Sequence, residues 1–169
     1  MSMFDRLAAF LEQRKDDIYP EDGSDLHVQI TGQVVELLTS RGELRPDQRV
    51  LDVGCGQGPA LAEFKKRGIA AQGITLGGDV AVCRDQGFDV TEMDMSDLDF
   101  EDGSFDFIWC RHALEHSIFP MFTLSEFNRL LTAGGGVYVE VPAPETTAKH
   151  ESNPNHYSVM GKTMWQHLF

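Results

Sequence analysis

The chain contains 169 residues, of which 41% are apolar and 24% are charged, as expected for one soluble globular domain. Its 14 basic and 27 acidic residues give a net charge of −13, which repels a phosphate backbone and excludes nucleic acid as the expected partner. No run approaches the roughly 18 apolar residues of a membrane span, and the N-terminus lacks the features of a signal peptide, so we expect a cytoplasmic protein that binds no membrane.

Two amphipathic helices are predicted within residues 1–44, with a break at residues 19–23. The apolar positions of the first helix are Phe4, Leu7, Ala8 and Leu11. The second helix begins at about Asp25, after a possible cap at Ser24, and its predicted apolar face contains Ile30, Val34, Leu37 and Leu38. We expect both helices to cover an edge of the sheet or its ligand pocket, and a structural role is favoured for His27.

The cysteines show no paired spacing typical of a disulfide framework or a zinc site. They stand at Cys55, Cys83 and Cys110, in a loop, a helix and a strand end respectively. We therefore expect reduced thiols and no metal ion.

A buried strand followed by a glycine-rich loop spans Val50–Gly58. The nearly continuous apolar run at its start is typical of a strand covered on both faces in a parallel sheet. Alternating glycines then allow positive φ angles and close approach of a ligand to the backbone. Pro59 follows, a favoured first residue of a helix, so the loop lies at a helix N-terminus.

This loop, Asp52 followed by Gly-x-Gly-x-Gly, resembles the first motif of the class I S-adenosylmethionine (SAM) dependent methyltransferases. It departs from a dinucleotide fingerprint at Pro59, and it lacks the Gly-Lys-Ser/Thr ending of a P-loop. The resemblance implies that Asp52 orders the loop and the amino end of the cofactor. The implied cofactor-binding residues here are Asp52, Gly54, Cys55, Gly56, Gln57 and Gly58.

The next two predicted strands, Ile69–Leu76 and residues 88–93, flank a helix at about residues 78–86. Where the family usually has an acidic residue for the ribose, this chain has Thr75, followed by Leu76; Asp79 is the alternative acceptor. The resemblance implies that the pair Asp94 and Met95 meets the adenine. The alternative is a loop aspartate with no partner.

A fourth strand, Phe105–Cys110, and the Leu-Glu-His sequence that ends at His116 are also similar to the family. Ligands of open parallel sheets bind at the carboxyl ends of strands, where the strand order reverses. Cys110 and Arg111, at the end of this strand, are implied cofactor-binding residues, and Arg111 and His112 are expected to face the reactive end of the cofactor. His112 or His116 is a candidate general base, because imidazole titrates near neutral pH. The alternative is that either ring only packs or binds backbone.

The C-terminal third contains a helix over Phe122–Leu131, which we expect Gly134–Gly136 to end, and a fifth strand over residues 137–141. Beyond Pro144 the chain is polar, until residues 156–168 predict a short helix that packs on the site or covers it. The resembling family continues with a helix and two more strands. We therefore expect a truncated chain, whose exposed fifth strand is available for self-association.

These observations predict one α/β domain, with a doubly wound, Rossmann-like and mainly parallel sheet of about five strands in the order 3-2-1-4-5 and helices on both faces. Residues 1–44 form the N-terminal helices, 45–145 the cofactor-binding core, and 146–169 a loose tail. The implied activity is methyl transfer from SAM to a small-molecule acceptor, with S-adenosylhomocysteine as product. The alternatives are a SAM-binding module without catalysis and a Rossmann-like dehydrogenase or nucleotide-binding protein.

Overall fold

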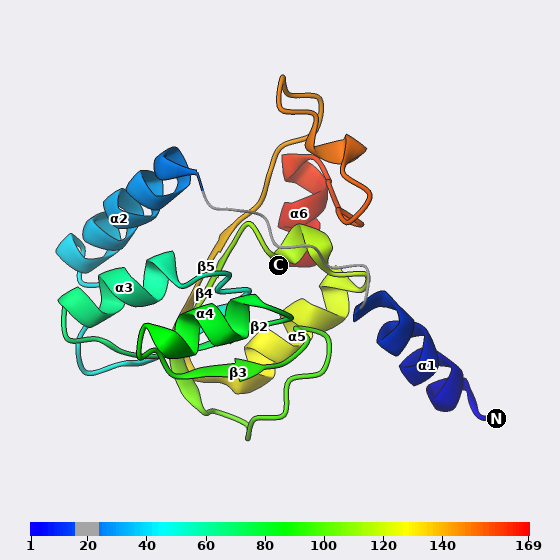
Figure 1. Ribbon diagram of the computed structural model, residues 1–169, viewed down its shortest axis with the longest axis horizontal. Helices are drawn as coiled ribbons and strands as arrows, with labels where there is room; N and C mark the ends of the chain where they lie inside the picture. The colour runs from blue at the N-terminus through cyan, green and yellow to red at the C-terminus, as the bar shows by residue number, and fades with distance from the viewer. Residues whose placement is uncertain (16–23) are drawn as a thin grey trace.

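The chain folds around a single parallel sheet of five strands (Figure 1). A computed structural model describes residues 1–15 and 24–169; the break predicted at residues 19–23 lies outside them. The strand order β3-β2-β1-β4-β5 confirms the predicted topology. The strands are β1 (Arg49–Val53), β2 (Ala70–Thr75), β3 (Val90–Glu92), β4 (Phe105–Arg111) and β5 (Leu131–Glu140).

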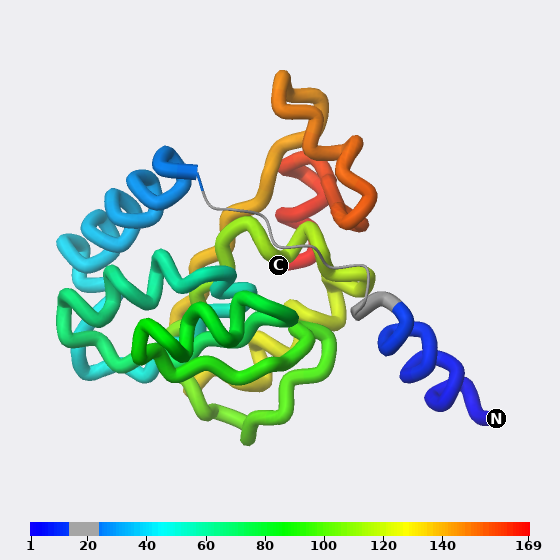
Figure 2. Tube along the Cα trace, viewed as in Figure 1, coloured from blue at the N-terminus to red at the C-terminus, as the bar shows by residue number. Residues whose placement is uncertain are grey.

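Helices cover both faces of the sheet, as the path of the chain shows (Figures 1 and 2). The α-helices are α1 (Met3–Lys15), α2 (Asp25–Ser40), α3 (Pro59–Lys66), α4 (Asp79–Asp85), α5 (Pro120–Leu130) and α6 (Lys162–Leu168). Two single-turn 3₁₀ helices are η1 (Leu114–His116) and η2 (His150–Ser152). Among the described helices, none combines the length and apolar character needed to cross a bilayer.

The alternation of side chains along each strand divides the core into two layers. Trp109 of β4 points to the layer of α2 and α3, where its ring stacks on Tyr138 and meets the edge of Phe64. Ile108, its neighbour in β4, points to the opposite layer, which contains Phe127 of α5. Both faces of β4 are buried from Phe107 onward, where residues 107–110 form a continuous apolar run, and its carboxyl end lies inside the molecule.

Helix α2 begins as predicted and buries the predicted Leu38, with Val34 packed partly against the core, but the face that it buries is shifted. The Ser24 side chain accepts a hydrogen bond from the His27 backbone N–H, which caps the helix. The buried residues are Thr31, Val35 and Leu38, whereas Leu37, predicted to face the core, is 45% exposed. The helix is rotated because Thr31 turns inward, where its hydroxyl hydrogen-bonds to the side chain of Arg111.

Helix α1 exposes most of its apolar side chains, so the prediction that both N-terminal helices cover an edge of the sheet or the ligand pocket holds fully only for α2. Phe4 is 72% exposed and Phe10 is 40% exposed, and in Figure 1 the helix stands apart from the sheet. Its one contribution to the cavity described below is Leu11.

The prediction that Gly134–Gly136 ends the fifth helix is wrong. Helix α5 ends at Leu130, and the glycines lie inside β5. The strand needs small residues there because it passes close to β4: a Cβ added at Gly136 would lie 3.0 Å from the ring of Phe107, its partner in the sheet. Gly136 therefore reflects close strand packing, whereas Gly134 has φ of +82° and no heavy atom within 4 Å of an added Cβ, and neither residue ends the helix.

Candidate functional site

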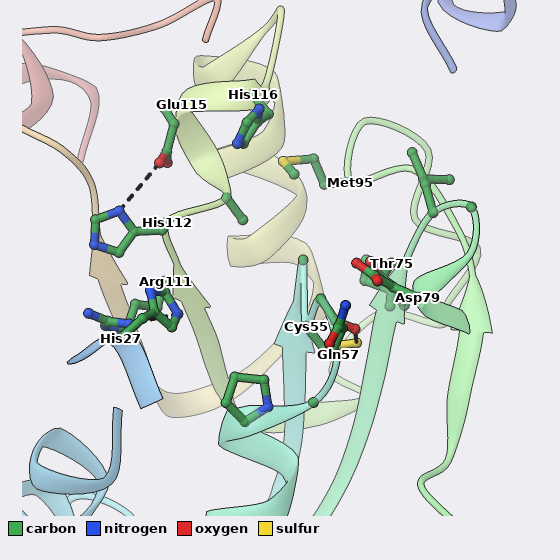
Figure 3. A pocket seen from close by; sticks show the side chains of 18 of the residues that line it. His27, Cys55, Gln57, Thr75, Asp79, Met95, Arg111, His112, Glu115 and His116 are labelled. Carbon is green, nitrogen blue, oxygen red and sulfur yellow. Dashed lines mark hydrogen bonds and ion pairs between the residues drawn. The ribbon is translucent and has the colours of Figure 1, made fainter. Parts of the chain in front are cut away.

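A cavity of about 710 Å³ lies at the carboxyl ends of β1, β2 and β4 (Figure 3). The switch in strand order falls at β1, which has β2 on one side and β4 on the other, and this is where open α/β sheets bind ligands. Of the fourteen residues that the sequence predicts for the site, Asp52 and Cys110 do not line the cavity. The twelve that do are Gly54, Cys55, Gly56, Gln57, Gly58, Thr75, Leu76, Asp94, Met95, Arg111, His112 and His116.

The three glycines of the loop after β1 all have positive φ angles, but the space around each of them differs. A Cβ at Gly54 would lie 2.4 Å from the Cβ of Ala113, and one at Gly58 would lie 2.9 Å from the Phe88 ring, so protein packing excludes side chains there. At Gly56, φ is +50°, and the nearest heavy atom is an Asp79 carboxylate oxygen 3.9 Å away. Gly56 therefore leaves open the space that a ligand at the cavity wall would use.

Hydrogen bonds hold this loop in one conformation. The backbone N–H groups of Gly54 and Cys55 both donate to the Ile74 carbonyl oxygen at 2.9 Å, and the Cys83 thiol donates to the Gly56 carbonyl at 3.1 Å. The loop is thus fixed to β2 and α4, and a ligand would meet a preformed surface.

Asp52 lies behind the loop instead of in the cavity. It is 2% exposed, its Oδ2 has no hydrogen-bond partner within the described residues, and burial raises its pKa to about 8. A buried carboxyl group without a partner is costly. A cationic group bound against the loop would reduce that cost, which fits the amino end of SAM.

Replacing Asp52 by asparagine is expected to change how stability depends on pH. Because the folded pKa lies above the unfolded value of 3.8, the native state holds a proton that the unfolded chain has lost between about pH 4 and 8. The free energy of unfolding of the wild type therefore falls by up to about 1.4 kcal/mol per pH unit in that window. Asp52→Asn removes this term. Urea denaturation of both proteins at pH 5 and pH 8 measures this term. If the free energy of unfolding of Asp52→Asn does not rise relative to that of the wild type as the pH increases, the raised pKa of Asp52 is contradicted.

The predicted ribose and adenine residues line the opposite wall from β4. Thr75, Asp79 and Gln57 lie close together in Figure 3, and Met95 lies at the same side of the cavity. The Asp94 carboxylate accepts a hydrogen bond of 2.7 Å from the Ser96 backbone N–H. The alternative of a loop aspartate without a partner therefore does not hold, because Asp94 shapes its own turn.

Arg111 reaches the cavity but is engaged by protein groups. Its guanidinium pairs with both oxygens of Glu140 at 2.9 and 3.0 Å, and its side chain is 4% exposed. Its Nη1 also bonds to Thr31 and to the Nε2 of His27, which must be the acceptor because a guanidinium only donates. Through these hydrogen bonds, Arg111 connects α2, β4 and β5 beside the cavity.

His112 is held between two carboxylates. Its Nε2 lies 3.0 Å from Glu140 and its Nδ1 lies 3.6 Å from Glu115, the contact drawn in Figure 3. Hydrogen bonding to Glu115 and Glu140 raises the pKa of His112 to about 9. An imidazolium has no lone pair with which to accept a proton, so this environment disfavours His112 as a general base.

A group of histidines gathers at the end of the cavity beyond β4. Five of the six histidines in the chain line it, namely His27, His112, His116, His150 and His156. The Nδ1 of His116 lies 2.9 Å from the Asn155 carbonyl oxygen, which can only accept, so Nδ1 carries a hydrogen and the neutral ring has its lone pair on Nε2. Glu115, His150 and Asn155 line the cavity but were not predicted from the sequence to do so. The density of histidines in 150–167 was the available signal.

Comparison with known proteins places this geometry among methyltransferases. The sequence model described as "Methyltransferase domain" matches residues 51–139, more than half of the chain. The 27-O-demethylrifamycin SV methyltransferase of Amycolatopsis mediterranei is 28% identical over 140 residues, 75% of this chain and 52% of that protein. The ubiquinone biosynthesis O-methyltransferase of Methylococcus capsulatus is 32% identical over 99 residues, 54% and 42% of the two chains.

Among solved structures, the [4+2]-cyclase SpnF is similar with a TM-score of 0.59 and 32% identity, over 68% of this chain and 46% of that one. The chain therefore spans about half the length of the curated relatives it matches. The family match begins within β1 and ends within β5, so it includes the loops after β1, β2, β3 and β4 but not the cavity residues of α2 and the tail.

Proposed function

Because the chain belongs to the methyltransferase-domain family, we propose that it binds SAM and transfers the methyl group to a small-molecule acceptor. The observation that carries this proposal is the open surface at Gly56, set at the switch point of the sheet and faced by Thr75 and Asp94. When bound, SAM supplies a methyl group on a sulfonium, which is a good leaving group.

In this proposal the protein acts mainly by positioning. The loop 54–58, with Asp52 buried behind it, holds the amino end of the cofactor, Thr75 and Leu76 hold the ribose, and Asp94 with Met95 holds the adenine. Residues of α2 and of the tail line the cavity and help to position the reacting groups. Of the two histidine candidates for a general base, the environment favours His116, whose neutral ring carries its lone pair on Nε2.

Calorimetric titration of the chain with SAM, S-adenosylhomocysteine and NAD tests the cofactor. We expect binding of the first two and none of NAD, because Pro59 and Thr75 depart from the dinucleotide pattern. Binding of NAD alone would favour the dehydrogenase interpretation and would contradict the proposal.

Asp94→Ala is expected to weaken SAM binding by about 1–3 kcal/mol, because a carboxylate that accepts from the adenine amino group is lost. Asp97→Ala is the matched control, since Asp97 is exposed in the same turn and does not line the cavity. An unchanged dissociation constant for Asp94→Ala would return that side chain to a purely structural role in the turn.

A second candidate function is cofactor binding without methyl transfer. The similarity to SpnF, a cyclase, favours it, because a protein of this fold then catalyses a reaction other than methyl transfer. This alternative predicts SAM binding with no methyl transfer to any acceptor in a screen that measures S-adenosylhomocysteine formation.

The proposal includes a cytoplasmic location, supported by three cysteines without disulfides. It also includes self-association through β5, the last strand of the described sheet, whose Val137 is 41% exposed. Solution scattering that shows a monomer would contradict the proposed self-association.

A further inference from the structure

The histidine-rich end of the cavity contains three side chains whose ligating atoms converge. One ring nitrogen each of His116 and His156 and one carboxylate oxygen of Glu115 lie within 4.8 Å of one another. We propose that these three residues bind a divalent transition-metal ion, with Zn²⁺ as the best fit. From the sequence we expected no metal ion, because the cysteine spacing shows no zinc pattern. The three residues are also far apart in the sequence, since Glu115 and His116 belong to η1 and His156 to the tail.

His116 is prepared as a ligand by its second nitrogen. A metal-binding histidine almost always donates its other ring N–H to a carboxylate or a backbone carbonyl, which fixes the ring and the tautomer. The bond from His116 Nδ1 to the Asn155 carbonyl, at 2.9 Å, does this. Asn155 is also one residue before His156, so the same backbone segment fixes one ligand and carries the other.

Glu115 provides the observation that points to a cation. The residue is 1% exposed, and its Oε2 is fully buried with no hydrogen-bond partner among the described residues. The nearest ring nitrogen of His112 lies 3.6 Å from the other oxygen, Oε1. A buried carboxylate with an unpartnered oxygen is costly, and a bound metal ion is one of the few groups that compensates it.

The donor set selects the type of ion and of site. Two imidazoles and one carboxylate are typical ligands of zinc, and they do not suit Mg²⁺ or Ca²⁺, which prefer oxygen. Ligand atoms around tetrahedral zinc lie about 3.4 Å apart, so binding draws the three groups, now within 4.8 Å of one another, together by up to about 1.4 Å. Three protein ligands leave a fourth position open, and all three residues line the cavity, so that position is open to a bound molecule.

The open position gives the ion a role in the proposed reaction. Glu115 and His116 lie across the cavity from Thr75 and Gln57 (Figure 3). The acceptor would enter on the side of Glu115 and His116. A zinc ion there would bind an acceptor hydroxyl and lower its pKa, so that the proton leaves to water. This role rests on the proposed methyl transfer, whereas the metal site does not. A metal on Nε2 also occupies the lone pair that a general base needs, so His116 serves one role or the other.

The test is titration of the tag-free, full chain with ZnCl₂ and CoCl₂ in the absence of SAM. Calorimetry is expected to show one ion per chain, and Co²⁺ to show visible d–d absorption typical of nitrogen and oxygen ligands. His116→Ala and His156→Ala should each weaken binding by more than about 100-fold, beyond the loss caused by an outer-shell partner. His167→Ala, which changes an exposed histidine of α6 outside the cavity, should bind as the wild type does.

Glu115→Gln keeps the shape of the buried side chain and removes its charge, and circular dichroism reports whether each variant is folded. Folded His116→Ala or Glu115→Gln protein with wild-type Zn²⁺ affinity overturns the proposal, as does equal loss in His167→Ala or no binding to the wild type. SAM titration of the same samples separates the two proposals. SAM binding without zinc binding would contradict only the proposed metal site. Zinc binding without SAM binding would contradict only the proposed methyl transfer.

Discussion

Gly56→Val is expected to abolish SAM binding, with a loss of at least about 100-fold in affinity, or ~2.7 kcal/mol. Gly56 has φ of +50°, which a β-branched residue adopts at a cost, and its Cβ direction is open toward the cavity. A valine there would occupy the surface that the ligand needs. Calorimetry with SAM measures the effect on protein whose circular dichroism is unchanged.

The matched control for this variant is Gly103→Val. Gly103 has φ of +65°, and a Cβ added there would have no heavy atom within 4 Å, so the variant carries similar backbone strain of about 1–2 kcal/mol without filling a cavity. Gly103 precedes β4 and therefore lies at the edge of the parallel sheet opposite the site. Full affinity in Gly56→Val, or equal loss in both variants, would show that the loop after β1 does not hold the cofactor.

Glu140→Ala is expected to destabilise the protein by about 3 kcal/mol. Glu140 forms two contacts with the Arg111 guanidinium, at 2.9 and 3.0 Å, and the arginine side chain is 4% exposed. Removing one member of a buried pair leaves the other charge without compensation. Burial alone would raise the pKa of Glu140, but hydrogen bonds from His112, Arg111 and Tyr138 outweigh it and lower the pKa to about 2, so the carboxylate is charged at neutral pH.

The double variant Arg111→Met/Glu140→Ala separates this explanation from simple loss of packing. It removes both charges, and we expect it to be more stable than Glu140→Ala alone in urea denaturation. Asp47→Ala is the control, because it breaks an exposed pair with Arg45 and should change stability little. A double variant that is less stable than Glu140→Ala would contradict the role of the unpaired arginine.

The strand order and the glycine loop were predictable because their signals are local and have one interpretation. A buried apolar run before Gly54 leaves little alternative to a strand in a parallel sheet. The face of α2 was not predictable in this way. Leu37 and Val34 are apolar, yet the helix buries Thr31, because a hydrogen bond to Arg111 on β4 decides its rotation. That contact joins residues 80 positions apart, and helical periodicity contains no information about it.

The side of the cavity that we propose for the cofactor was more predictable than the opposite side for a similar reason. Gly56 lies in the loop after β1 and Thr75 is the last residue of β2, so the topology alone places them at the cavity. His156 comes from a tail with little regular structure, and it reaches the cavity through backbone contacts such as that of Ser158 with Glu115. Composition and spacing do not reveal where such a segment folds back. Arg111 was placed at the cavity, but its engagement by Glu140 depends on the register of β4 and β5.

The contact between Gly54 and Ala113 couples two loops that an engineer would want to vary separately. A Cβ at position 54 would lie 2.4 Å from that of Ala113, so the loop after β1 needs glycine at position 54 whenever position 113 carries a Cβ. Libraries that vary both loops should therefore keep Gly54, and they should favour small residues at position 113, where Ala113 is 3% exposed. Loops transplanted from relatives into this scaffold should likewise be selected as pairs.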